Sequence, residues 1–172
     1  MRFLSAARSL FLIPVLLAGC NSSQPKTKVR EDTTSSKAAT VFPARPGAAP
    51  PTFKLFHQDN DTLTLVTTVT ATDDEVSAIL WQLREATQQH TFDALHLPQK
   101  FVDARQPTIW FHVYRGARCA GEKYTKGALP CEASYHGAGD YTLGSYSNPH
   151  WNDGVLRHQD GTETRLWNPD LP

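Results

Sequence analysis

The sequence predicts an α+β fold in which a small antiparallel sheet packs against one main amphipathic helix, with one disulfide. Three observations lead to this prediction: short runs rich in Thr, Val and Leu, one stretch with helical periodicity, and an Asp-Gly pair between two such runs near the end of the chain. Strands joined mostly by hairpins, with a helix against them, are typical of an antiparallel sheet. We expect the element order β-β-α-β-β-β within a single domain at residues 52–172.

The first part of this domain predicts a hairpin and then a helix. Residues 53–57 and 62–70 have strand composition, and the polar residues 58–61 between them form a turn. Thr-Asp-Asp-Glu at residues 72–75 fits a capping box and places three acids at the positive end of the helix dipole. The apolar stripe that follows predicts an amphipathic helix ending near residue 89: Val76, Ile79, Leu80, Leu83 and Ala86.

The second part predicts a central strand and a C-terminal hairpin. Both faces of residues 108–114 are bulky, which favours a central place in the sheet. Alternation divides their side chains into two sets, with Ile109, Phe111 and Val113 on one face and Trp110, His112 and Tyr114 on the other. Residues 155–158 and 163–167 flank Gln-Asp-Gly-Thr, whose Asp-Gly centre is a strong hairpin signal.

Two of the three cysteines are expected to form the disulfide. Cys119 and Cys131 lie in the domain, and an even pair is typical of a disulfide in an oxidising compartment. The alternative is a redox or metal-binding pair, but the eleven intervening residues match neither a Cys-x-x-Cys redox motif nor the spacing of common zinc sites.

The segment from residue 135 to residue 151 is the most unusual in the chain, because it mixes glycine with aromatic side chains and histidine. Tyr and Trp offer flat, amphipathic faces at low entropy cost, and such a loop could stack on a sugar ring or hold a peptide. The alternative is a glycine-punctuated β segment whose aromatic side chains complete the core, the more common situation in a small domain. Under the first interpretation the binding candidates are Tyr135, His136, Tyr141, Tyr146, His150 and Trp151.

No motif in the sequence predicts catalysis, so the catalytic residues stay unknown and no cofactor or metal is expected. Histidine and aspartate are ligands that zinc uses in enzymes, but the sequence has no HExxH-like pair. The residues that would have to supply a metal site are scattered: His112, His136, His150, His158, Asp140 and Asp153. Residues 144–148 do not match the GxSxG nucleophile motif, and Gly-Ala-Gly at 137–139 is too short for a phosphate loop.

The first twenty residues combine a basic start, a short apolar run at residues 10–17 and the motif Leu-Ala-Gly-Cys at residues 17–20. A transmembrane helix needs about 20 apolar residues, more than this run contains, whereas a secretory signal has this pattern. The motif resembles the signal of bacterial lipoproteins. That resemblance implies a signal peptide at residues 1–19 and a lipid-modified Cys20 that anchors the protein in a bilayer. Asn21 after the cysteine implies sorting to the outer membrane, with the domain in the periplasm or, alternatively, at the cell surface.

Residues 20–51 are predicted to form the lipidated cysteine and a disordered tether rich in Pro, Ser, Thr and Lys. The tether is basic, whereas residues 52–172 hold ten Lys or Arg against fifteen Asp or Glu. An acidic domain without a basic stripe argues against nucleic acid as a partner. Residues 70–84 are similar to strand–helix modules of uncharacterised bacterial lipoproteins, a resemblance that implies no activity.

These observations favour a membrane-anchored envelope lipoprotein that binds a partner without catalysis. The expected partners are the lipid bilayer, through Cys20, and an envelope protein or a cell-wall polymer. Two alternatives stay open. One is a metal-dependent envelope hydrolase that uses His136, Asp140 and His150, and the other is a purely structural lipoprotein.

Overall fold

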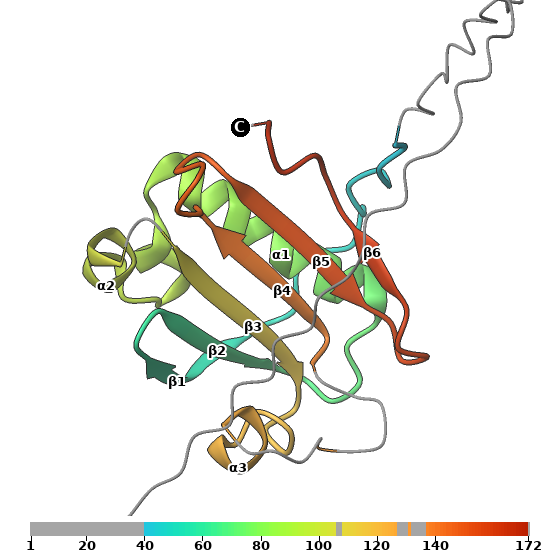
Figure 1. Ribbon diagram of the computed structural model, residues 1–172. Coiled ribbons are helices and arrows are strands. Elements are labelled where there is room, and N and C mark those ends of the chain that lie inside the picture. Colours follow the sequence, from blue (N-terminus) through green and yellow to red (C-terminus); the bar gives the residue numbers. More distant parts are fainter. Residues whose placement is uncertain (1–39, 106–107, 127–130, 132–136, 172) are drawn as a thin grey trace, which may run out of the picture. The chain divides into compact units, whose positions relative to one another are not determined.

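In the described part of the chain, six strands form one sheet in which each strand lies beside the strand that precedes it in the sequence (Figure 1). The computed structural model describes residues 40–105, 108–126, 131 and 137–171. The strands span Lys54–Asp59 (β1), Thr62–Thr67 (β2), Ile109–Arg115 (β3), Gly139–Leu143 (β4), Asn152–Arg157 (β5) and Glu163–Arg165 (β6).

The sheet is mixed, because β2 and β3 are parallel while every other pair of neighbouring strands is antiparallel. Parallel strands need a crossover connection, since the chain must return to the end of the sheet at which it started. Here the crossover contains helix α1 (Asp73–Gln89), a 3₁₀ helix (Phe92–Leu95) and the short helix α2 (Gln99–Ala104). A further short helix, α3 (Glu122–Thr125), follows β3.

The predicted α+β class is confirmed, whereas the predicted element order β-β-α-β-β-β and the antiparallel sheet are wrong in detail. The crossover makes β3 parallel to β2, and residues 139–143 form an additional strand, β4. Gly139 conceals this strand in the sequence, because it interrupts the apolar pattern. A Cβ atom there would lie 2.9 Å from Cδ1 of Leu80 and 2.9 Å from the carbonyl oxygen of Val155. Helix α1 therefore approaches β4 so closely that only glycine fits.

Helix α1 begins at the predicted capping box, which is confirmed. The Glu75 N–H donates to Thr72 Oγ1 at 3.2 Å, and the Thr72 N–H donates to Glu75 Oε2 at 2.7 Å. These two bonds satisfy backbone donors that the first helical turn leaves without partners. The predicted apolar stripe of this helix is buried throughout. None of the helices in the described residues is both long and apolar enough to span a bilayer.

The main core lies between α1 and one face of the sheet. The ring of Phe92, which follows α1, stacks on Phe111 of β3 with centroids 5.4 Å apart. The completely inaccessible side chains of this layer include residues of α1, β2, β3 and β4: Val76, Ile79, Leu80, Leu83, Leu63, Leu65, Ile109, Phe111, Val113 and Tyr141. Burial of this apolar surface provides most of the free energy that holds the helix against the sheet.

A stack of aromatic and cationic groups extends this layer at the surface of α1. The rings of Trp81 and Trp167 lie 4.7 Å apart, and the Arg84 guanidinium lies 5.3 Å and 5.0 Å from their respective centroids. Arg45, within the segment expected to form the tether, lies 5.8 Å from the Trp81 ring and pairs with Glu85. Arg45 is thus held against α1 by a cation–π and an ionic contact.

The predicted disulfide between Cys119 and Cys131 is confirmed, with the two Cα atoms 5.3 Å apart. The bridge belongs to a second, smaller apolar cluster with Val66, Tyr114 and Ala120. Side chains alternate along a strand, so Val66 and Tyr114 face away from their neighbours in the main core. The disulfide therefore covers part of the sheet face opposite α1.

Candidate binding groove on the open face

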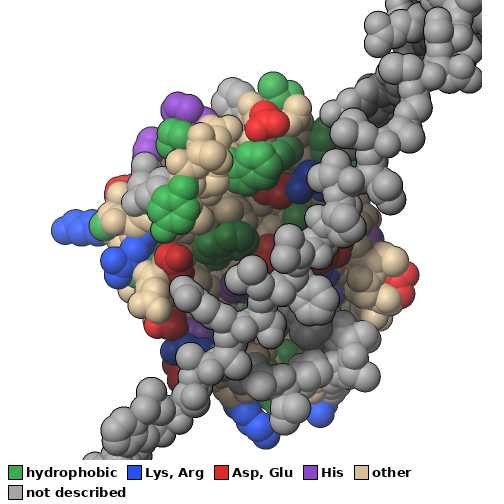
Figure 2. All heavy atoms as spheres, in the orientation of Figure 1, with side chains coloured by type: hydrophobic (Ala, Val, Ile, Leu, Met, Phe, Trp, Pro, Cys, Tyr) green, Lys and Arg blue, Asp and Glu red, His purple; other side chains and the backbone are tan. Residues whose placement is uncertain are grey.

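The sheet face opposite α1, called the open face below, carries polar and aromatic side chains. In Figure 1, α1 lies behind the sheet, so Figure 2 looks onto this face, and hydrophobic side chains gather on its upper part. The predicted alternation of the central strand is confirmed: Phe111 is completely buried, whereas Trp110 is 39% exposed. Four residues that pair with one another across β2, β3, β4 and β5 form a row on this face: Thr64, His112, Asp140 and Val155.

A groove of about 380 Å³ lies at one end of the open face, where β2 and β3 begin and β4 ends. Its volume falls in the range of about 300–1,000 Å³ that small-ligand sites occupy. We call it the aromatic groove. It is lined by Asp61, Thr108, Trp110, Thr142, Gly144, Ser145, Tyr146 and Trp151.

The three aromatic rings of this groove come from two separate segments. Trp110 belongs to β3, and its backbone N–H donates to the Asp61 carbonyl at 2.8 Å, which places the start of the strand beside the β1–β2 turn. Tyr146 and Trp151 belong to the loop between β4 and β5. Tyr146 is 91% exposed, and Trp151 is half-buried.

The loop between β4 and β5 is closed by its own hydrogen bonds. The Gly144 N–H donates to the Trp151 carbonyl at 2.6 Å, and Gly144 has φ +74°, a conformation that favours glycine. The Ser145 N–H donates to the Asn148 carbonyl at 2.9 Å, and the Asn148 N–H donates to Ser145 Oγ at 3.0 Å. Tyr146 lies within this turn, which holds its backbone while its ring reaches solvent.

The polar lining offers hydroxyl groups and one carboxylate. Thr108 Oγ1 is buried and has no hydrogen-bond partner among the described residues. The Asp61 carboxylate accepts a bond from the Thr62 hydroxyl at 3.2 Å and lies at the exposed edge. No Lys or Arg is among the described residues that line the groove. The groove is therefore aromatic, hydroxyl-rich and weakly acidic.

A row of polar and ionic contacts crosses the open face next to the groove. The ring of His112 stacks on Trp110 with centroids 6.4 Å apart, and His112 Nδ1 lies 2.7 Å from Asp140 Oδ1. The Arg157 guanidinium lies 2.5 Å from Asp140 Oδ2 and donates to Glu163 Oε1 at 2.8 Å. Burial acts to lower the pKa of Arg157, but the charges of Asp140 and Glu163 outweigh it and raise the pKa. Both oxygens of Asp140 are therefore used in contacts between strands.

The structure divides the predicted binding residues into three groups. Tyr146 and Trp151 line the aromatic groove, while His150 is exposed in the same loop without lining the groove. Tyr135 and His136 lie outside the described residues.

The third group is Tyr141, whose predicted binding role is corrected by its position, because its ring is fully buried against α1. Its hydroxyl lies 2.8 Å from Thr87 Oγ1. Burial raises the pKa of Tyr141 to about 12, against the opposing effect of this hydrogen bond. Tyr141 thus belongs to the core, as the alternative interpretation of this segment predicts.

The described residues among those considered for a metal site have other partners or lie apart. His158 Nδ1 lies 2.5 Å from Asp73 Oδ2, and the Arg165 guanidinium pairs with both oxygens of Asp153 at 2.9 and 3.0 Å. Nowhere in the described ranges do three His, Cys, Asp or Glu side chains meet in a group that could hold a metal ion. The proposed set of His136, Asp140 and His150 includes one residue outside the described ranges.

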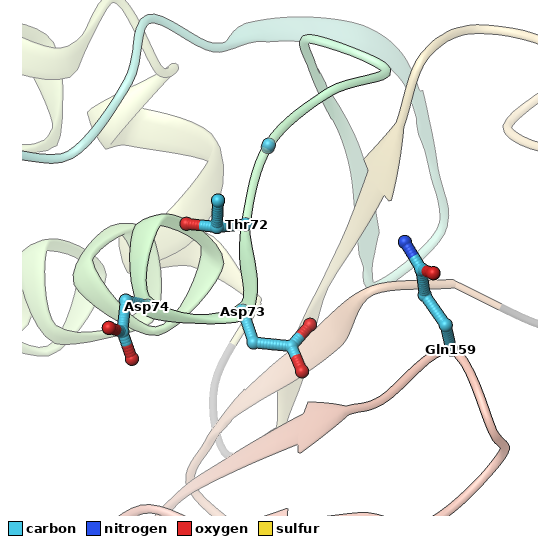
Figure 3. A pocket seen from close by; sticks show the side chains of 5 residues that line it. Thr72, Asp73, Asp74 and Gln159 are labelled. Carbon is cyan, nitrogen blue, oxygen red and sulfur yellow. The ribbon is translucent and has the colours of Figure 1, made fainter.

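A second hollow, of about 420 Å³, lies at the N-terminus of α1 and is lined by Ala71, Thr72, Asp73, Asp74 and Gln159. In Figure 3 the carboxylate of Asp73 points to the side of Gln159, whereas Asp74 points away from it. The two Asp73 oxygens are occupied by Arg115 Nη2 and His158 Nδ1, each at 2.5 Å. The acidic group of this hollow therefore joins α1, β3 and the end of β5 rather than facing an empty space.

Four residues that line the groove were not among the binding candidates from the sequence: Asp61, Thr108, Trp110 and Thr142. A signal for Trp110 was present, since alternation placed it on the face opposite the core. The other three become neighbours only through the pairing of β2, β3 and β4.

No protein-family model matches this chain, and comparisons with curated proteins and with solved structures gave no match.

Proposed function

We propose that the protein is a lipid-anchored protein of the bacterial envelope, whose domain binds a partner in the aromatic groove without catalysis. The lipobox-like motif ending at Cys20, outside the described residues, supports the anchor, and Asn21 supports the outer membrane. The domain would then lie in the periplasm, and its partner would be an envelope protein or a cell-wall polymer.

One observation carries the binding role: three aromatic side chains surround one groove, and Tyr146 among them is 91% exposed. The Tyr146 ring contributes nothing to the core. A partner that covered an aromatic ring of this kind would remove much of its roughly 150–250 Å² from water, and Tyr and Trp dominate the energetics of binding surfaces.

The contacts of the neighbouring histidine favour binding over catalysis. His112 holds Asp140 through Nδ1, and the other Asp140 oxygen is held by Arg157. This row links β3, β4 and β5 across the sheet, as cross-strand ion pairs do. We therefore assign it to holding the open face rather than to proton transfer.

The anchor is tested by expressing the full-length protein in a Gram-negative bacterium with an alkyne-labelled fatty acid. The wild-type protein should carry the label and sediment with membranes. Cys20→Ala should be unlabelled and soluble, while Ser22→Ala serves as the matched control next to the motif. An unlabelled wild-type protein would refute the anchor.

The binding role is tested by sedimenting the full-length protein, held in lipid nanodiscs, with isolated envelope fragments. Tyr146→Ala removes the exposed ring and should lower recovery about fivefold, which corresponds to about 1 kcal/mol. Phe56→Ala is the control, because Phe56 is an exposed aromatic residue of β1 that does not line the groove. Equal recovery of both variants and the wild type would refute the groove as the binding surface.

A further inference from the structure

The lining of the aromatic groove also indicates the chemistry of its ligand. We infer that the groove holds an uncharged glycan, whose sugar rings stack on the aromatic side chains while its hydroxyl groups bond to the polar lining. This inference rests on the proposed binding function, and it selects a cell-wall polymer over an envelope protein as the partner.

Stacking requires flat faces that a ligand can reach, and the groove supplies them. Trp110 is 39% exposed and Tyr146 is 91% exposed, and the half-buried Trp151 lines the same space. A sugar ring has an apolar face of C–H groups that packs against an indole or phenol ring, and a rim of hydroxyl groups that stays polar. A groove with aromatic rings and hydroxyl groups in the same lining matches both parts of such a ring.

The polar lining matches a ligand that both donates and accepts hydrogen bonds. Thr108 lines the groove, and its buried Oγ1 has no partner among the described residues, so a ligand hydroxyl that displaced the atoms covering it would supply the missing hydrogen bond. Asp61 offers carboxylate oxygens, which only accept, and Ser145 and Thr142 add hydroxyl groups to the lining. Sugar hydroxyl groups both donate and accept, so they can bond to each of these side chains, including Ser145 Oγ, which already accepts a bond from the Asn148 N–H.

The charges of the groove lining disfavour an anionic ligand. Asp61 is the acidic member of the lining, and no Lys or Arg is among the described residues that line the groove. The nearby Arg157 guanidinium is bonded to Asp140 and Glu163, which neutralise its charge. A phosphate or carboxylate ligand would therefore meet repulsion from Asp61 without a compensating cation. An uncharged polyol avoids that penalty.

The test measures binding by isothermal titration of the full-length protein in lipid nanodiscs. Three uncharged probes are used, namely tetramers of β-1,4-N-acetylglucosamine, β-1,4-glucose and α-1,4-glucose. The glucosamine tetramer, which is the first probe without its acetyl groups, gives a matched cationic control, and a galacturonate tetramer gives an anionic one. A hexaproline peptide represents the peptide alternative.

At least one uncharged tetramer should bind with saturation at millimolar concentration or below, and the galacturonate tetramer should not. Tyr146→Ala should weaken that binding about tenfold, and Thr108→Val should weaken it severalfold, because Val keeps the shape and removes the hydroxyl. Phe56→Ala should bind like the wild type. Circular dichroism of each variant verifies the fold.

Three results would overturn the inference: no binding of any uncharged tetramer, binding of hexaproline alone, or equal binding in Tyr146→Ala. The envelope sedimentation separates this failure from failure of the proposed function. If Tyr146→Ala lowers envelope recovery while no tetramer binds, the groove is a binding surface for another partner and only the glycan is refuted. If recovery and tetramer binding are both unchanged in Tyr146→Ala, both proposals are refuted.

Discussion

Alkaline pH should destabilise the domain through one buried side chain, Tyr141. The ring is fully buried, and burial raises the pKa of its hydroxyl from 10.0 to about 12. The folded state therefore holds this proton more tightly than the unfolded state. Its contribution to the free energy of unfolding is complete below pH 10 and is lost as the pH rises towards 12. A shift of this size corresponds to a free energy of about 3 kcal/mol.

Tyr141→Phe isolates this contribution. At neutral pH the variant should lose about 1 kcal/mol, the net value of a typical hydrogen bond, because Thr87 keeps its bond to the Leu83 carbonyl at 3.0 Å. At pH 12 the wild-type protein has lost about 2 kcal/mol through Tyr141, and the variant has no hydroxyl to titrate. The order of stability should therefore reverse, with the crossing between about pH 10 and 11.

The measurement is urea unfolding followed by circular dichroism between pH 7 and pH 12. Tyr146→Phe is the matched control, because its ring is 91% exposed and its substitution should leave the stability unchanged within about 0.5 kcal/mol at every pH. A difference between the wild type and Tyr141→Phe that stays constant from pH 7 to pH 12 would refute the assignment of the raised pKa to burial.

Three further changes test the packing of the domain. Gly154→Ala places a Cβ atom 2.2 Å from a ring carbon of Trp167, so the ring must move, and urea unfolding should show a loss of about 1–3 kcal/mol; an unchanged midpoint would contradict the close approach. Thr72→Ala removes the side-chain acceptor of the capping box and should cost about 1 kcal/mol in thermal unfolding, an effect that a frayed helix start would not give. Replacing Cys119 and Cys131 together by Ser should lower the stability by roughly 3 kcal/mol, and the wild type in reductant should match the double variant.

Local signals in the sequence predicted the elements whose geometry depends on a few neighbouring residues. The capping box at Thr72 and the hairpin around Gly161 are of this kind, because turn and cap geometry depend on side chains within four residues. Strand β4 is different. Gly139 is required by the approach of Leu80, which lies on a helix far away in the sequence, so a local pattern cannot reveal the strand.

In the groove, too, local sequence patterns predict some features, whereas others depend on contacts between distant segments. The outward position of Trp110 follows from alternation in one strand, and the exposed Tyr146 lies in the segment that the sequence singled out. They line one groove because β4 pairs with β3, and this pairing cannot be predicted from the spacing of residues in the sequence. Tyr141 belongs to that same segment but faces the core, because position within β4 decides which face of the sheet a side chain joins.

The strands lie in the sheet in the same order as in the sequence, and this order affects how the protein can fold during synthesis. Among the described strands, none has to enter between two that are already paired, so a chain that emerges N-terminus first can extend the sheet by adding strands at one edge. The risk of aggregation is greatest after β3 has been synthesised. Both faces of β3 carry bulky side chains, and its second edge stays unpaired until β4 has been synthesised. A chain cut short before Gly139 would keep that edge exposed permanently and should aggregate, whereas loss of only the three-residue β6 would expose the lesser edge of β5.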